Sequence, residues 1–334
     1  MMKLSLMETM LHSEEHEQFI KNIVELWDGD AESASFIRAS STFIYSFKRE
    51  DEKFILRLVP NDHESFVERE VNYLLYLHSN GLSVNRPVVS KRKRFTERAV
   101  SPAGPVIASV FTFCEGQLYE IDELSHQQFF LWGKALGHLH SFAATFAQDK
   151  ILNSQPVLLS RLNHIEMSEA FEKVFAEEIS FLRKWLVNKP MTRGSYGKIH
   201  FDFELDNLIW DGINVQMVDF ESSIDGWYAA DIAFALRDLF SDGVDLRDDR
   251  FIEFIKGYRV YHPITDKEFA EIPMFLRLHD LLLFEDLSQA VIENSEKNHP
   301  KWVDNLNQKL LNKMNDIRYR IGRVGRFNGF ESEK

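Results

Sequence analysis

The chain has 334 residues, of which 44% are hydrophobic and 27% are charged, a composition typical of packed globular proteins that excludes a disordered chain. Its single cysteine, Cys114, excludes an internal disulfide and a thiolate metal cluster, and no apolar run reaches the roughly 18 residues of a membrane span, so we expect a cytoplasmic protein without a membrane partner. The formal net charge of -13 argues against nucleic acid as a partner, because an acidic surface repels phosphate backbones.

The first elements in chain order are a helix, a hairpin and a second helix. Apolar residues recurring on one face predict a helix over residues 14–27 with Ser13 as its cap. Alternating aromatic and β-branched residues predict strands at Thr42–Phe47 and Phe54–Val59, joined by a polar turn. A helix then follows from about Glu64 to His78, with the apolar spacing of a buried face.

Further strands give way to helices near the single cysteine. Val84–Val89 and Val106–Phe113 are predicted strands, and the basic segment Lys91–Arg94 between them is interpreted as a solvated turn. After Cys114 long helices are expected, beginning at Phe129–Phe146 behind a Ser125 cap. The sequence therefore predicts an α+β protein with two lobes, a β-rich one over residues 1–114 and a mainly helical one over residues 115–334.

A second hairpin carries the residues that point to chemistry. The apolar runs Leu208–Trp210 and Val215–Val218 are separated by Asp211-Gly212, a strong turn signal. Since a hairpin brings its ends together, Asn207 and Asp219 should lie side by side. An amide oxygen and a carboxylate are ligands suited to Mg²⁺.

Asp202 precedes this hairpin by a short loop and completes the constellation. It lies five residues before Asn207, so the loop can return its carboxylate to the same site without placing it on the metal. That arrangement suits a group that accepts a proton from a hydroxyl nucleophile while a metal neutralises the phosphates of a nucleotide.

The pattern His200-x-Asp202, then Asn207 five residues on, then Asp219, resembles the aminoglycoside phosphotransferase and choline kinase family, relatives of the protein kinases. The resemblance implies a bilobal protein-kinase-like fold and ATP or GTP with Mg²⁺ as cofactors. It also implies Asp202 as catalytic base, Asn207 and Asp219 as metal ligands, and His200 as a structural support of the loop. The segment before Asp231 resembles the same family, and implies that Asp231 steadies the catalytic loop.

The first lobe supplies candidate nucleotide-binding residues. Glu70 falls on the apolar face of its helix and needs a cationic partner, for which Arg57 is the natural candidate. In kinases the corresponding strand lysine contacts phosphates and pairs with a helix glutamate, although Arg57 and Glu70 can also be a purely structural pair.

Two further segments complete the expected nucleotide site. The segment 37–42 stands where kinases have a glycine-rich loop but contains no glycine, so Ser40 and Ser41 are expected to offer hydroxyls and backbone N–H groups instead. The segment 110–116 resembles the link between lobes in these kinases, which makes Phe113 and Cys114 candidates to line the adenine pocket.

We therefore expect an ATP-dependent phosphotransferase acting on a hydroxyl of a small molecule: an amino alcohol, an aminoglycoside-like or homoserine-like compound, or a sugar amine. A protein Ser/Thr kinase is a weaker alternative, because Asp231 follows Asp219 too soon for a long activation segment. The glycine-free loop and Arg57 motivate a second alternative, a nucleotide-binding pseudokinase.

The distribution of charge leads to an expectation about the acceptor. Residues 115–334 carry 25 Lys and Arg against 36 Asp and Glu, whereas residues 1–114 are nearly neutral. An acidic cleft would attract cations, so the acceptor is expected to be positively charged. The alternative is that this charge only keeps the protein soluble.

Overall fold

The computed structural model describes residues 4–60, 64–167, 175–240, 243–293 and 301–324. The chain forms two compact units, of which unit 1 comprises residues 1–135 and 204–223, and unit 2 comprises residues 136–203 and 224–334. Units are defined by contacts rather than by the change from strands to helices, so the lobe boundary expected at residue 114 stays a prediction. Both expected lobes also include terminal residues outside the described ones.

Unit 1 is built on one sheet in which every pairing is antiparallel. The order is β1-β2-β3-β6-β4, with β5 also paired to β6. The strands are β1 (Asp30–Ala39), β2 (Phe43–Arg49), β3 (Glu52–Pro60), β4 (Pro87–Val88), β5 (Thr96–Ser101) and β6 (Gly104–Thr112). The hairpin expected from the sequence is confirmed as β2 and β3. Strand β5 was not expected.

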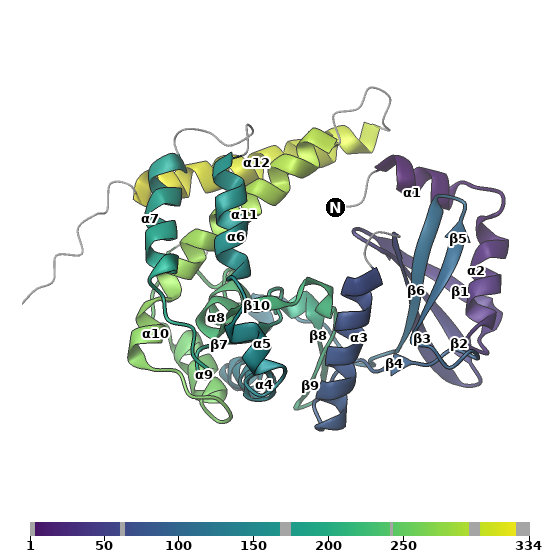
Figure 1. Ribbon diagram of the computed structural model, residues 1–334, viewed down its shortest axis with the longest axis horizontal. Helices are drawn as coiled ribbons and strands as arrows, with labels where there is room; N and C mark the ends of the chain where they lie inside the picture. Colours follow the sequence, from purple (N-terminus) through teal and green to yellow (C-terminus); the bar gives the residue numbers. More distant parts are fainter. Residues whose placement is uncertain (1–3, 61–63, 168–174, 241–242, 294–300, 325–334) are drawn as a thin grey trace, which may run out of the picture. The chain divides into compact units, whose positions relative to one another are not determined.

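The two faces of this sheet bury different clusters because side chains alternate along each strand. Phe54, Leu56 and Leu58 of β3 join the core that includes residues of α2 (His16–Glu25). Val59 packs instead with residues of α3 (Glu64–Ser79). Figure 1 shows α2 and α3 on either side of the sheet, with α1 (Leu4–Leu11) nearby. Arg57 shares its side of β3 with Val59, and so faces α3.

Both predicted helices of unit 1 are confirmed, with one correction. Helix α2 begins at His16 with Glu15 at its N-cap, so Ser13 is not the cap. The Ser13 hydroxyl instead accepts a hydrogen bond from the backbone N–H of Glu15, at 3.2 Å.

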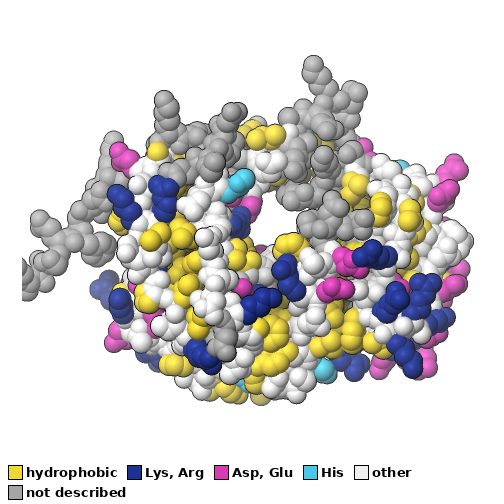
Figure 2. All heavy atoms as spheres, viewed as in Figure 1, with side chains coloured by type: hydrophobic (Ala, Val, Ile, Leu, Met, Phe, Trp, Pro, Cys, Tyr) yellow, Lys and Arg dark blue, Asp and Glu magenta, His cyan; other side chains and the backbone are white. Residues whose placement is uncertain are grey.

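The basic segment Lys91–Arg94 is an exposed turn, as expected. Lys91 pairs with Asp28 at 3.0 Å, and Arg92 pairs with the buried Glu97 at 3.3 Å. Figure 2 shows Lys and Arg side chains interspersed with acidic ones at the end of unit 1 near β2 and β4. Such mixed surface charge is typical of a solvated face.

The second predicted hairpin is confirmed and belongs to unit 1. It consists of β8 (Leu208–Asp211) and β9 (Asn214–Met217), with Leu208 opposite Met217. Gly212 in its two-residue turn has φ +60°, which glycine adopts without a steric penalty. Residues Leu205–Asn207 (η4) and Phe220–Ser222 (η5) form single 3₁₀ turns at the open end, and η2 is a third such turn at Ile121–Glu123.

Unit 2 is mainly helical around a small antiparallel ribbon of β7 (Tyr196–Ile199) and β10 (Ile224–Trp227). Helix α11 packs against α8, α6 and α12, as Figure 1 shows. The helices are α4 (His126–Ala143), which begins in unit 1, α5 (Gln148–Leu152), α6 (Val157–Met167), α7 (Ala176–Val187), α8 (Tyr228–Ala235), α9 (Asp249–Tyr258), α10 (Asp266–Ala270), α11 (Ile272–Glu293) and α12 (Lys301–Val324). Ser125 caps α4 as predicted, since its hydroxyl accepts from the N–H of Gln128 at 3.3 Å.

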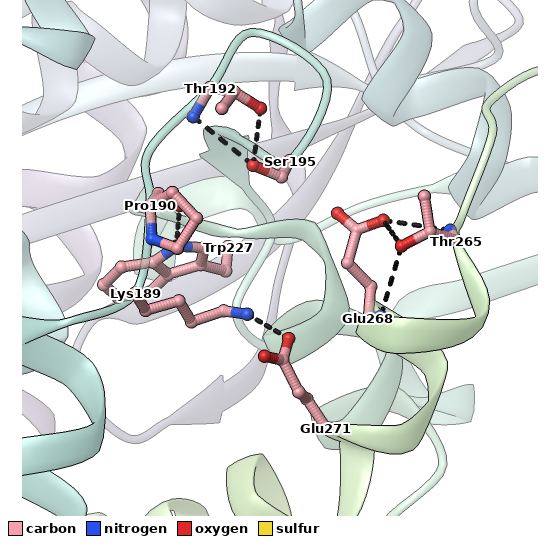
Figure 3. A network of polar contacts seen from close by, with 8 residues as sticks. All are labelled: Lys189, Pro190, Thr192, Ser195, Trp227, Thr265, Glu268 and Glu271. Carbon is pink, nitrogen blue, oxygen red and sulfur yellow. Dashed lines mark hydrogen bonds and ion pairs between the residues drawn. The ribbon is translucent and has the colours of Figure 1, made fainter.

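Polar contacts hold the start of β7 and the end of β10 in place (Figure 3). The indole N–H of Trp227 donates to the carbonyl of Pro190 at 3.0 Å, and Lys189 pairs with Glu271 just before α11. Thr265 and Glu268 close a capping box on α10. Of these contacts, the Trp227–Pro190 hydrogen bond ties the end of β10 to the segment that leads into β7.

The structure was also searched for membrane-spanning segments. None of the helices within the described residues combines the length and the hydrophobicity needed to cross a bilayer.

Candidate active site

The open end of the second hairpin brings Asn207 and Asp219 together within unit 1. The N–H of Val218 donates to the carbonyl of Asn207 at 3.0 Å, and Asp219 is the next residue. Asp219 has φ +64° and ψ +58°, a left-handed conformation that is uncommon for any residue except glycine. Backbone conformations of this kind cluster at functional sites.

These two residues fit a hard divalent cation. Asn207 is buried and offers an amide oxygen, while the Asp219 carboxylate is 25% exposed. Oxygen ligands of this kind suit Mg²⁺, which binds a few protein groups and keeps several waters.

The ion pair expected between Arg57 and Glu70 is present. Arg57 Nη1 donates to Glu70 Oε1 at 2.9 Å, and Nη2 contacts the other carboxylate oxygen, with only 6% and 7% of the two side chains exposed. Burial opposes the charge on Arg57, but Glu70 outweighs that effect and raises the pKa of the guanidinium above its usual range. The role of this pair in nucleotide binding stays a proposal.

The glycine-free loop between β1 and β2 contacts the segment that follows β9. The Ser41 hydroxyl donates to Glu221, while the N–H of Ser40 donates to the carbonyl of Thr42 at 3.1 Å. Arg38 Nη2 lies 2.8 Å from Asp219 Oδ2. Sequence reasoning assigned no role to Arg38 or Glu221.

Glu221 sits in a carboxylate-rich environment. Its burial, together with the neighbouring charge of Asp219, raises its pKa above the usual value for glutamate. Arg57 Nη1 lies 3.8 Å from it. Side-chain contacts within unit 1 thus connect the segment 37–42 to Asp219 and Glu221, and Glu221 to Arg57.

Phe113 and Cys114, expected to line the adenine pocket, are both half-buried. Lys53 lies over the Phe113 ring, 4.2 Å from its centroid. Burial raises the pKa of the Cys114 thiol to about 11, so the sulfur stays protonated at neutral pH and behaves as a small apolar group. Their contact with a nucleotide stays a proposal.

Asp231 of unit 2 accepts hydrogen bonds from the backbone just before Asp202. Its two carboxylate oxygens accept from the N–H groups of His200 and Phe201, each at 2.8 Å, and from His140 Nε2 at 2.9 Å. Asp231, His200 and His140 are fully buried. Burial lowers the pKa of His140, so a neutral imidazole donates from Nε2.

A buried network of hydrogen bonds continues from His140. With Nε2 protonated, His140 Nδ1 accepts from the Tyr258 hydroxyl at 2.8 Å. His262 Nδ1 lies 3.2 Å from the same hydroxyl and 2.9 Å from the carbonyl of Pro263, to which it donates. The sequence analysis assigned no role to His140, because the chain gives no local signal for a contact 91 residues away.

Asp202 is one of the more accessible carboxylates of unit 2, with 38% of its side chain exposed. Arg237 Nη1 lies 3.8 Å from Asp202 Oδ1 and donates to the carbonyl of Phe234 at 3.0 Å. Nothing in the sequence marked Arg237. The structure therefore groups Asp202, His200 and Asp231 in unit 2, and Asn207, Asp219, Arg57, Glu70, Ser40 and Ser41 in unit 1.

Comparisons with known proteins identify the family. The model of the phosphotransferase enzyme family matches residues 35–264. Amicoumacin kinase of Bacillus subtilis (strain 168) is 21% identical over 291 residues, covering 82% of this chain and 85% of that protein.

Solved structures of low identity share the fold. An amicoumacin kinase in complex with AMP-PNP, Ca²⁺ and Ami superimposes with a TM-score of 0.75 at 20% identity, over 93% of this chain and 94% of the other. A microcompartment-associated aminopropanol kinase gives a TM-score of 0.72 at 18% identity, over 92% and 96%. The α+β kinase-like fold expected from the sequence is thereby confirmed.

Proposed function

The chain belongs to the phosphotransferase enzyme family and is a small-molecule kinase. We propose that it transfers the γ-phosphoryl group of ATP to a hydroxyl of an amino alcohol or a related acceptor. The observation that carries the proposal is the buried Asp231 carboxylate, which fixes the backbone of the two residues before Asp202. Because the backbone before Asp202 is fixed in this way, the Asp202 carboxylate needs little reorganisation to receive a proton.

In this proposal each residue group has one task. Asp202 accepts the proton of the acceptor hydroxyl, with Arg237 Nη1 lying 3.8 Å from its carboxylate. Asn207 and Asp219 hold Mg²⁺, which, when bound, neutralises charge on the nucleotide phosphates. Arg57 contacts a phosphate while Glu70 fixes its fork, Ser40 and Ser41 face the phosphates, and Phe113 with Cys114 borders the base.

The acceptor class rests on weaker support than the reaction. Two relatives are named for amicoumacin and for aminopropanol, so amino alcohols come first among candidates. The positively charged acceptor expected from net charge stays a proposal, since net charge does not locate a binding site. GTP in place of ATP, and a cytoplasmic location, likewise stay predictions.

A phosphoryl-transfer screen tests the function. Purified protein is incubated with Mg²⁺, ATP and a panel in which each amino alcohol is paired with its neutral hydroxyl isostere, and products are identified by mass spectrometry. We expect ATP-dependent phosphorylation of at least one small molecule, and none by Asp219→Ala. Phosphorylation of a Ser/Thr peptide library instead would favour the protein kinase alternative, and nucleotide binding without any transfer would favour the pseudokinase. Equal efficiency for both members of each pair would refute the cationic acceptor.

A further inference from the structure

The segment 37–42, which comprises the end of β1 and the turn to β2, lacks the glycines with which kinases approach nucleotide phosphates, yet it contains an arginine that contacts the predicted metal ligand Asp219. Arg38 Nη2 lies 2.8 Å from Asp219 Oδ2, and the Ser41 hydroxyl donates to Glu221. Both contacts lie within unit 1 and tie the loop to the segment after β9.

An irregularity in the sheet directs Arg38 away from the regular alternation. Phe36 of β1 is opposite Tyr45 of β2, whereas Arg38 is opposite Ile44, so Ile37 has no partner in the register. An extra residue of this kind is a β-bulge, which twists the strand and re-aims the side chains that follow. Bulges of this type are common beside functional sites.

The charges around Asp219 differ in their freedom to move. Arg57 is held by Glu70 in a buried bidentate pair, with 6% of its side chain exposed. Arg38 is 55% exposed and has a single described contact with Asp219. An exposed ion pair stabilises a protein little, so it exchanges readily for a stronger partner.

We propose that Arg38 is a phosphate-binding residue that changes partner when the nucleotide binds, an inference that rests on the proposed function. In the nucleotide-free protein its guanidinium neutralises Asp219. With a nucleotide and a divalent cation bound, Asp219 would hold the cation and Arg38 would contact phosphate oxygens instead. A guanidinium fork matches phosphate well, so one side chain does what backbone N–H groups of a glycine loop do elsewhere.

Two ligand titrations test both halves of this exchange on the full chain. Arg38→Met keeps the length of the side chain and removes its charge. Arg98→Met is the matched control, since Arg98 also forms an exposed ion pair in unit 1, with Glu64, but lies outside the proposed site. Calorimetry with AMP-PNP and Mg²⁺, and with AMP alone, measures the phosphate contribution. Electron paramagnetic resonance with Mn²⁺ alone measures access to Asp219.

For Arg38→Met we expect binding of AMP-PNP with Mg²⁺ to weaken by about tenfold or more, binding of AMP to stay within about twofold, and binding of Mn²⁺ alone to tighten. Arg98→Met should match the wild type in all three. Equal weakening of AMP and AMP-PNP, or none, would overturn the phosphate role, and unchanged Mn²⁺ binding would overturn the exchange. If the wild type binds no AMP-PNP, the proposed function fails as well.

Discussion

Asp231 illustrates how one carboxylate can fix the backbone before the proposed catalytic base, Asp202. It accepts hydrogen bonds from two backbone N–H groups and one imidazole, at 2.8–2.9 Å, and its side chain is fully buried. Hydrogen bonds to a buried charged group are strong, and losing one partner leaves the others unsatisfied. Burying a carboxylate is costly unless all these hydrogen bonds are made, so replacing Asp231 by another residue should destabilise the protein.

We expect Asp231→Asn to lower the free energy of unfolding by about 3 kcal/mol. Both carboxylate oxygens of Asp231 accept hydrogen bonds, so the NH₂ group of an asparagine would face an N–H donor and leave it unsatisfied. Chemical denaturation measures this change, and phosphoryl transfer should fall with it. Asp225→Asn on β10 is the control: Asp225 pairs with Lys198 at a partly exposed site, and its loss should cost less than about 1 kcal/mol. Equal stability of Asp231→Asn and wild type would refute the conclusion that the Asp231 hydrogen bonds stabilise this loop.

At the scale of elements, the link 113–117 lies against strand β8. Gln117 and Trp210 exchange backbone hydrogen bonds of 2.9 Å, and Gln216 donates to the carbonyl of Glu115 at 3.1 Å. Gly116 has φ +152°, and a Cβ there would lie 2.4 Å from the Trp210 carbonyl oxygen. The link and the β8–β9 hairpin therefore share one interface that only glycine permits at position 116.

Gly116→Ala should force the link away from β8, lowering the thermal midpoint and weakening nucleotide binding by at least about tenfold, because the clash is with backbone. Gly104→Ala is the control that introduces backbone strain without a steric clash. Gly104 has φ +110° but nothing within 4 Å of a Cβ, so this variant should lose stability and keep nucleotide affinity. Similar nucleotide affinities for the two variants would contradict the account.

Elements encoded by local signals were predictable. The second hairpin was predicted because Asp211-Gly212 marks its turn, and the Arg57–Glu70 pair because Glu70 lies on an apolar helix face. Strand β5 was missed because Glu97 and Arg98 make it look like a loop. Glu97 is buried, and its carboxylate accepts from the Ser90 hydroxyl at 2.6 Å and pairs with Arg92 at 3.3 Å, contacts that no periodicity reveals.

The contacts that complete the site were not predictable for a related reason. Arg38 meets Asp219 across 181 residues, through a bulge that the sequence does not mark. Arg237 comes near Asp202 only because both flank unit 2 elements that pack together.

For the whole molecule, buried histidines should couple stability to acid. Burial lowers the pKa of His140, that of His262 to about 4 and that of His279 to about 3. The folded state favours the neutral imidazoles, so below pH 6.5 the unfolded chain binds more protons. Stability is therefore fully present above about pH 6.5 and is lost as pH falls towards 4.

His262→Asn should reduce this acid sensitivity, because the amide can still donate to the Pro263 carbonyl but does not titrate. Denaturation midpoints measured between pH 7 and pH 4 should fall less steeply for this variant than for the wild type. His78→Asn, at an exposed position, should leave the slope unchanged. Parallel slopes for His262→Asn and wild type would show that His262 does not contribute.

The central claim is that Asp202 receives the proton of the acceptor hydroxyl. Its most direct measurement is single-turnover phosphoryl transfer by Asp202→Asn beside Asp206→Asn, an exposed carboxylate four residues away in the same loop. We predict that Asp202→Asn slows transfer about 10²- to 10⁴-fold with unchanged nucleotide affinity, while Asp206→Asn transfers at the wild-type rate. Transfer by Asp202→Asn at the wild-type rate would contradict the account.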